Sequence, residues 1–252
     1  MVILSKAIST SLSPNIEKDD IKLAFNLLFK PSNWIAGRAV EELEEEFKKY
    51  LGVRYAFSFN SGRSALMAIL YSLGAKKEDE ILIQSFTCTA SINPILYFNA
   101  KPVFIDIDDS LNLDPLELEK KITGKSKAVV LQHTFGWPAK VEKILEIAKK
   151  NNLFVIEDVA HSLGAKYKNK LCGSFGDASF FSFGRDKIIS SVFGGMAVTN
   201  NQKIAEKIKE FRDKISYPSR LWAFQQILHP ILVNYFVLPA YSLSRLAGLV
   251  LL

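Results

Sequence analysis

The sequence predicts an α/β fold with a mainly parallel central sheet and helices on both of its faces. Short runs of apolar, β-branched or aromatic residues recur along the chain, and most are separated by segments with apolar residues at helical spacing. The runs carry few charges, which is typical of strands buried on both faces. Parallel neighbours need a crossover between them, and the helical segments supply it.

Seven runs are predicted strands, and six amphipathic or apolar segments are predicted helices. The strands are 55–59, 81–83, 103–107, 128–131, 153–156, 178–183 and 196–198, and the helices are 16–30, 38–51, 64–73, 90–98, 116–122 and 139–149. Gly52 follows the second helix, where a C-cap glycine is expected. Asp114-Pro115 begins the fifth helix, with aspartate as the N-cap and proline in the first turn. No internal repeat is present in the sequence.

Composition narrows the class of protein. The chain has 252 residues, is 48% hydrophobic and 23% charged, and has a formal net charge of +6. These values exclude a disordered or low-complexity protein, and the length suits one large domain, or one domain plus a fragment of a second. Cys88 and Cys172 are too few for a disulfide framework and lack metal-ligand spacing, and we see no signal peptide, so a cytoplasmic location is expected. The sequence has no Lys/Arg-rich run, so nucleic-acid binding is not favoured.

The C-terminal segment has a different composition. We expect residues 1–215 to form the α/β domain, with 1–36 as an N-terminal arm and first helix, and 216–252 to form an apolar helical segment. Between residues 221 and 252 the only charged side chain is Arg245. Pro230 and Pro239 interrupt this run and disfavour a clean transmembrane helix. Two interpretations remain: helices that contact a membrane surface or a partner, or the start of a C-terminal region that covers this apolar surface.

Polar residues follow five of the predicted strands, where ligands bind in parallel sheets. After the first strand, residues 60–64 (Asn-Ser-Gly-Arg-Ser) lead into a helix, whose unpaired N–H groups form an anion site. Gly62 would let a phosphate approach the backbone. The alternative is that Ser61 or Ser64 only caps the helix.

Two further residues point to a cofactor. Asp158 ends a buried strand, where its carboxylate needs a partner such as a protonated ring nitrogen; alternatively it caps the next turn. Lys187 follows the strand 178–183, where desolvation would favour a neutral, nucleophilic amine; alternatively it is a solvated surface lysine. His133 and His161 lack zinc-site spacing and are interpreted as hydrogen-bonding or packing residues. A phosphate site, an aspartate and a lysine in this order match the needs of pyridoxal 5′-phosphate.

With these motifs the chain resembles the DegT/StrS family of sugar aminotransferases, which have the type I fold of pyridoxal-phosphate enzymes. The resemblance runs from about Trp34 to Arg212. Its strongest stretches are 155–165 (VIEDVAHSLGA), 174–183 (SFGDASFFSF), Lys187 and 194–200 (GGMAVTN).

The resemblance implies a role for individual residues. Lys187 would form the aldimine with the cofactor, Asp158 would face its ring nitrogen, and His161 would lie beside the ring. The phosphate would be bound by the backbone N–H groups of Gly62 and Arg63 and by the hydroxyl of Ser182. Cys88 occupies the position of an aromatic residue that stacks on the ring in the family, and residues 184–185 and 192–195 also depart from the family pattern. No metal is implied.

The implied function is a pyridoxal-phosphate-dependent aminotransferase, cytoplasmic and homodimeric, that acts in polysaccharide biosynthesis. It would move an amino group from an amino acid, usually glutamate, to a keto group of a nucleotide-linked sugar. Family members continue with a smaller C-terminal domain, so the resemblance implies that 216–252 begins an incomplete C-terminal region. Three alternatives stay open: a pyridoxal-phosphate lyase, an amino-acid aminotransferase, and a binding or regulatory protein of this fold, including a membrane-associated one.

Overall fold

The structure is a computed structural model that describes residues 15–35 and 37–243. Its internal contacts divide the chain into two compact units. The larger, here the sheet unit, comprises Glu41–Ser182 and Gly194–Ser216; the smaller, here the hairpin unit, comprises Met1–Val40, Phe183–Phe193 and Tyr217–Leu252. The predicted division of the chain at residue 215 stays a prediction. Parts of the predicted N-terminal arm and of the predicted C-terminal segment, residues 1–14, 36 and 244–252, lie outside the described residues.

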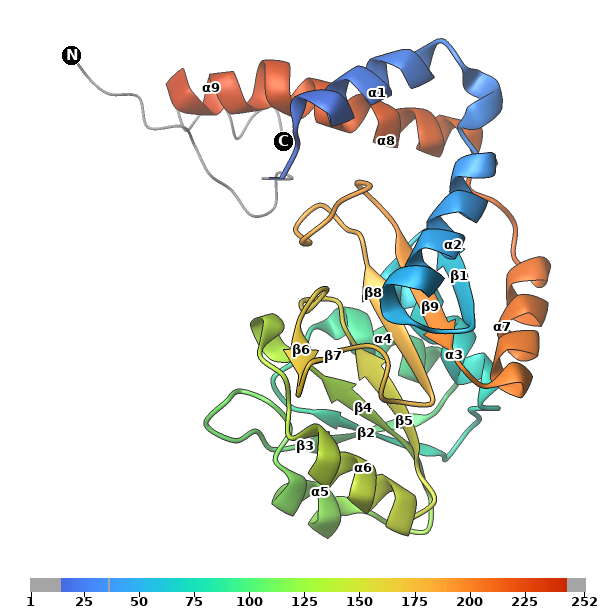
Figure 1. Cartoon of the computed structure of the whole chain (residues 1–252), viewed down its shortest axis with the longest axis vertical. Helices are drawn as coiled ribbons and strands as arrows, with labels where there is room; N and C mark the ends of the chain where they lie inside the picture. The colour runs from blue at the N-terminus through green and yellow to red at the C-terminus, as the bar shows by residue number, and fades with distance from the viewer. Residues whose placement is uncertain (1–14, 36, 244–252) are drawn as a thin grey trace. The chain divides into compact units, whose positions relative to one another are not determined.

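The sheet unit is built on a seven-stranded sheet in the order β1-β9-β8-β5-β4-β2-β3 (Figure 1). The strands are β1 (Tyr55–Phe59), β2 (Glu80–Gln84), β3 (Lys101–Ile105), β4 (Ser126–Gln132), β5 (Phe154–Asp158), β8 (Ala178–Ser182) and β9 (Gly195–Thr199). Strands β3, β2, β4, β5 and β8 pair in parallel, while β9 is antiparallel to both β8 and β1. The predicted mainly parallel sheet is therefore confirmed, and each predicted strand matches an observed one to within about two residues.

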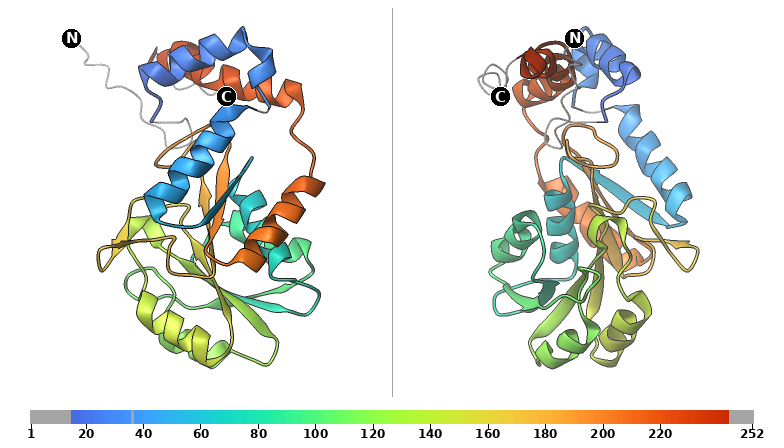
Figure 2. Two further views of the ribbon diagram at one scale, coloured as in Figure 1. Left: turned by 45° about the vertical axis from the view of Figure 1, so that its right-hand side comes forward. Right: turned by 90° about the vertical axis from the view of Figure 1, so that its left-hand side faces the viewer.

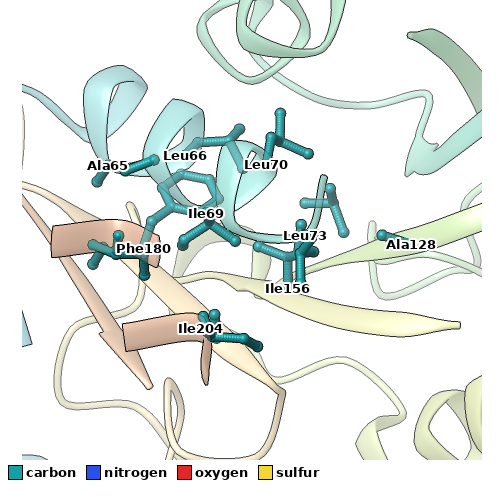
Figure 3. Close-up of a cluster of buried hydrophobic side chains, with 14 of the residues drawn as sticks. Ala65, Leu66, Ile69, Leu70, Leu73, Ala128, Ile156, Phe180 and Ile204 are labelled. Atoms are coloured by element: carbon teal, nitrogen blue, oxygen red, sulfur yellow. The ribbon is translucent and has the colours of Figure 1, made fainter. Parts of the chain in front are cut away.

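Helices cover both faces of this sheet, as predicted (Figure 2). They are α2 (Arg38–Leu51), α3 (Gly62–Ser72), α4 (Thr89–Tyr97), α5 (Pro115–Lys121), α6 (Val141–Lys150) and α7 (Gln202–Lys214). One apolar cluster joins α3, α4 and α7 to one face, and a second joins α5 and α6 to the other. Figure 3 shows part of the first cluster, where Leu66 and Ile69 of α3 pack in the same core as Phe180 of β8.

Local sequence signals explain how several of these elements begin and end. The side chain of Asp114 accepts a hydrogen bond from the Leu116 N–H at 2.9 Å, which confirms the predicted cap of α5. Gly52 has a φ of +68° after α2, the conformation for which a C-cap glycine was expected. A small hairpin of β6 (Lys166–Tyr167) and β7 (Lys170–Leu171) was not predicted, because two-residue strands leave no periodic pattern.

In the hairpin unit, α1 (Lys18–Leu28) packs along α8 (Arg220–Leu232), which continues through a π-helical turn (Val233–Val237) into α9 (Leu238–Leu243). Two ring contacts show that these two segments run antiparallel. The ring centroids of Phe25 in α1 and Tyr235 in the π-helical turn are 6.3 Å apart, and those of Trp34, which follows α1, and Phe224 in α8 are 5.5 Å apart. The sequence-based expectation that Pro230 interrupts the helix is wrong. Proline removes one backbone hydrogen bond, and the packing of the neighbouring Ile231 against α1 keeps the segment helical.

Candidate active site

The N-terminus of α3 has the geometry of an anion site. Ser61 is the N-cap: its hydroxyl accepts the N–H of Ser64 at 3.1 Å, and its carbonyl accepts the N–H of Ala65 at 3.1 Å. The first-turn N–H groups left over are those of Gly62 and Arg63, the two that the resemblance assigned to a phosphate. The capping interpretation of Ser61 is confirmed, because its hydroxyl binds an N–H group of the helix itself, whereas the phosphate role of Gly62 and Arg63 stays a prediction.

Three chain segments approach one another closely beside this turn. A Cβ placed on Gly62 would lie 3.0 Å from the Ser182 Cβ and 3.2 Å from the Phe181 carbonyl oxygen. One placed on Gly195 would lie 2.4 Å from the Ser61 carbonyl carbon. Glycine at both positions lets β8, β9 and the start of α3 meet, and it puts the hydroxyl-bearing Ser182 next to the free N–H groups.

Asp158 lies at the carboxyl end of β5 and is 5% exposed. Its Oδ2 accepts a hydrogen bond from the Ser91 hydroxyl at 3.1 Å, and its Oδ1 accepts the N–H of Ala160 at 3.0 Å. Ser91 belongs to α4 and donates its own N–H to the Cys88 carbonyl at 2.9 Å. These bonds fix the carboxylate by both oxygens, and they tie it to the first turn of α4. The turn-capping alternative for Asp158 therefore holds for one of these two hydrogen bonds, the one from the Ala160 N–H.

A pocket of about 160 Å³ lies at the carboxyl ends of β2 and β4 and next to β5. Its lining includes two of the predicted site residues, Cys88 and His161, together with Phe86, Thr87, Gln132, Thr134 and Phe135. The imidazole of His161 stacks on the Phe135 ring, with centroids 5.8 Å apart and planes 13° apart. Cys88 is exposed and caps α4 through its sulfur, which accepts the Ala90 N–H at 3.5 Å.

Glu157, the neighbour of Asp158, is fully buried and belongs to a structural network. Its carboxylate lies 3.1 Å from His133 Nε2 and accepts the N–H groups of Gly173, Phe175 and Gly176 at 2.8, 2.6 and 2.8 Å. Burial by itself would raise the pKa of Glu157, but the hydrogen bonds from His133 and from backbone N–H groups outweigh it and lower the pKa. The hydrogen-bonding interpretation of His133 is thereby confirmed.

Lys187 belongs to the hairpin unit, in the segment that follows β8 directly in the chain. Its side chain is 14% exposed, and its Nζ lies 3.0 Å from Asp186 Oδ2. Its carbonyl accepts a hydrogen bond from Asn15 Nδ2 at 2.9 Å. Ile188 and Ile189, which follow Lys187, are 51% and 44% exposed, so these two isoleucines do not lie in a buried setting. The role of Lys187 stays a prediction.

The sheet unit thus brings together six of the seven predicted site residues: Gly62, Arg63, Cys88, Asp158, His161 and Ser182. Sequence reasoning missed Ser91, which is separated from Asp158 by 67 positions, and Phe135, which has a φ of +51°. The signal for Ser91 was a polar residue on the buried face of a predicted helix. No sequence signal pointed to Phe135, because a phenylalanine rarely adopts a left-handed backbone conformation.

The mainly parallel sheet with helices on both faces agrees with the type I fold of pyridoxal-phosphate aminotransferases that the sequence predicts. The solved structures agree: the Helicobacter pylori aminotransferase PseC, of pseudoaminic acid biosynthesis, matches with a TM-score of 0.74 and 29% identity, covering 94% of this chain and 68% of that one. This chain belongs to the DegT/DnrJ/EryC1/StrS aminotransferase family, which matches residues 15–225. The family is one of pyridoxal-phosphate-dependent enzymes.

Two curated relatives carry an activity in their names. The chain is 40% identical to a GDP-perosamine synthase of Escherichia coli O157:H7 over 72% of this chain and 50% of the relative. It is 37% identical to a dTDP-3-amino-3,6-dideoxy-alpha-D-galactopyranose transaminase of Aneurinibacillus thermoaerophilus over 77% of this chain and 54% of the relative. The chain spans about half the length of the curated relatives it matches.

Proposed function

We propose that this chain forms the cofactor-binding part of a sugar aminotransferase. The enzyme would move an amino group from glutamate to a keto group of a sugar linked to a nucleoside diphosphate, in polysaccharide biosynthesis. The observation that carries the proposal is the pairing, in one sheet unit, of the open first turn of α3 with the buried, doubly hydrogen-bonded Asp158. Relatives of 37% and 40% identity that are named as enzymes of GDP- and dTDP-linked amino sugars support the substrate class.

The residues present fit pyridoxal 5′-phosphate. A phosphate needs N–H and O–H donors with no side chain in the way, and the turn at Gly62 offers two N–H groups beside the Ser182 hydroxyl. A pyridine nitrogen needs an anionic partner to stay protonated, and Asp158 is a carboxylate held by Ser91 and Ala160. When bound, this cofactor withdraws electrons from the Cα of the amino donor.

Each side chain then has a distinct task. Asp158 holds a proton on the ring nitrogen, and Ser91 holds Asp158. Gly62, Arg63 and Ser182 bind the phosphate. Lys187 would attach the cofactor, be displaced from it by the amine of the amino donor, and then carry the proton from the donor Cα to the cofactor carbon that it had held. His161, whose imidazole stacks on Phe135, would lie beside the ring.

The assembly and setting of the enzyme belong to the same proposal. We infer a homodimer in the cytoplasm, as the family resemblance implies. Residues 216–252 would begin a C-terminal region, as the family resemblance implies. Glutamate as the donor follows the usual preference that the resemblance implies.

Asp158→Asn should lower the rate of sugar amination by about 10²-fold, because a neutral amide cannot keep the ring nitrogen protonated. The rate is measured as 2-oxoglutarate released from glutamate in the presence of GDP- and dTDP-linked keto sugars. Ser91→Ala is the matched variant: it removes one hydrogen bond and leaves the charge, so the loss should stay below about tenfold. An Asp158→Asn protein with the wild-type rate and an unchanged melting temperature would remove Asp158 from the site.

A further inference from the structure

We propose that α1 and the helix that runs from α8 to α9 form an amphipathic hairpin that lies flat in the surface of an anionic lipid bilayer. The proposal concerns the hairpin unit alone and does not depend on the activity assigned above. It rests on three features of that unit: an apolar stripe on the long helix, its continuation on α1, and the distribution of charge.

The long helix carries an exposed apolar stripe along one face. Leu221, Leu232, Tyr235 and Phe236 are 68%, 45%, 56% and 59% exposed. Their spacing keeps them on one side of the helix, and the polar member of that side is Gln225. The opposite side is already buried, through residues that include Ala223, Ile231, Val233 and Val237. Among the described residues of the hairpin unit, the stripe therefore forms a second apolar face of this helix, and of its four members Tyr235 has a ring contact, with Phe25 of α1.

Helix α1 extends this stripe. Phe25 is 42% exposed and its ring lies 6.3 Å from that of Tyr235. Phe29, four residues on and so on the same side of α1, is 84% exposed. Lys18 and Lys22 precede Phe25 by seven and three residues and flank it on that side, where their charged ends can reach lipid headgroups.

The charges favour an anionic surface as the partner. Between Tyr217 and Leu252 the sequence contains Arg220 and Arg245 and no acidic residue. The acidic residues of α1, Asp19 and Asp20, lie six and five positions before Phe25 and so on other sides of the helix. Basic side chains beside an apolar and aromatic face are typical of interfacial helices on anionic lipids.

Lying in the surface suits this hairpin better than crossing the bilayer. Among the described residues, Arg220–Ala240 is the helical stretch whose length and composition would allow it to span a membrane. However, α1 packs along it and carries exposed Lys18, Asp19 and Asp20. A spanning helix would take these charges into hydrocarbon, which is strongly disfavoured, whereas a flat hairpin leaves them in water.

Co-sedimentation of the 252-residue chain with vesicles tests the proposal. We expect binding to vesicles of equal parts phosphatidylglycerol and phosphatidylcholine, at least about tenfold weaker binding to phosphatidylcholine alone, and release by alkaline carbonate. Leu232→Glu and Phe236→Glu should each weaken binding by about tenfold or more, since each removes one inserted side chain. Leu116→Glu is the matched control: it changes a leucine of α5 that is 70% exposed, and binding should not change.

Several outcomes would overturn the proposal. One is no sedimentation with either vesicle by a chain whose circular dichroism and thermal melting show that it is folded. A second is equal loss of binding in Leu116→Glu and Phe236→Glu. Resistance to carbonate would indicate a spanning helix instead. A dimer in sedimentation equilibrium that dissociates in Phe236→Glu, without vesicle binding by the wild type, would assign the stripe to a second copy of the chain.

Discussion

Lys187→Ala is expected to lower sugar amination by about 10⁴-fold, the full contribution of a positioned acid–base group. In the proposed reaction this lysine both attaches the cofactor and moves the proton at the Cα of the amino donor, and a methyl group can do neither. The Lys187 side chain is 14% exposed and pairs with the neighbouring Asp186, so its loss should leave the melting temperature within a few degrees of the wild-type value. The rate is measured with glutamate and a nucleotide-linked keto sugar.

The control for this variant is Lys150→Ala. Lys150 forms a surface ion pair with Glu119 at 3.0 Å and is 72% exposed, so its replacement should leave the rate unchanged. A second readout follows covalent attachment. After borohydride reduction of the wild-type protein with pyridoxal 5′-phosphate, mass spectrometry should find the added mass on the peptide with Lys187. Attachment to another lysine, with Lys187→Ala fully active, would contradict the assignment.

Glu157→Ala should destabilise the protein by about 4 kcal/mol, measured as the free energy of unfolding in denaturant. The change leaves three backbone N–H groups and the His133 ring buried without their acceptor. Glu157→Gln keeps the shape of the side chain, but we expect it to destabilise the protein as well. His133 Nδ1 accepts the Ala139 N–H at 3.2 Å, so Nε2 must donate. An amide NH₂ in place of the oxygen that faces Nε2–H and the Gly173 N–H would offer an acceptor to neither of them.

The same group gives the protein an acid limit. The pKa of Glu157 is lower in the folded chain than its ordinary value of 4.5. Its contribution to stability is therefore complete above pH 4.5 and is lost as the pH falls through the folded pKa. Glu157→Gln should flatten this part of the stability profile, whereas Glu119→Gln, at a surface pair, should not and should cost at most about 0.5 kcal/mol. Equal profiles for wild type and Glu157→Gln would show that other groups set the acid limit.

The local parts of the fold could be predicted from the sequence. The run Tyr55–Phe59 is apolar and ends at Asn60-Ser61-Gly62, so both the end of β1 and the start of α3 are written in consecutive residues. Asp158 was found the same way, as a polar residue at the end of an apolar run, whereas Ser182 was implied by the family resemblance. Such signals survive because each depends on neighbours a few positions away.

Long-range contacts account for what could not be predicted. Nothing in Gly195–Thr199 indicates that β9 runs antiparallel between β8 and β1, because strand order is set by packing across the whole sheet. The glycine at 195 is explained by the backbone of Ser61, 134 positions earlier, which leaves no room for a side chain. The bond between Ser91 and Asp158 likewise joins a helix to a distant strand. The hairpin of α1 and α8 pairs opposite ends of the described chain.

The most direct measurement is the half-reaction with the amino donor alone. Protein loaded with pyridoxal 5′-phosphate is mixed with glutamate in the absence of any keto sugar, and 2-oxoglutarate and the two forms of the cofactor are quantified by chromatography. An aminotransferase should release about one 2-oxoglutarate per bound cofactor and convert the cofactor to pyridoxamine phosphate, and Lys187→Ala should do neither at a comparable rate. Loaded wild-type protein that releases no 2-oxoglutarate and keeps its cofactor unchanged, with glutamate and with other amino acids, would contradict the assignment as an aminotransferase.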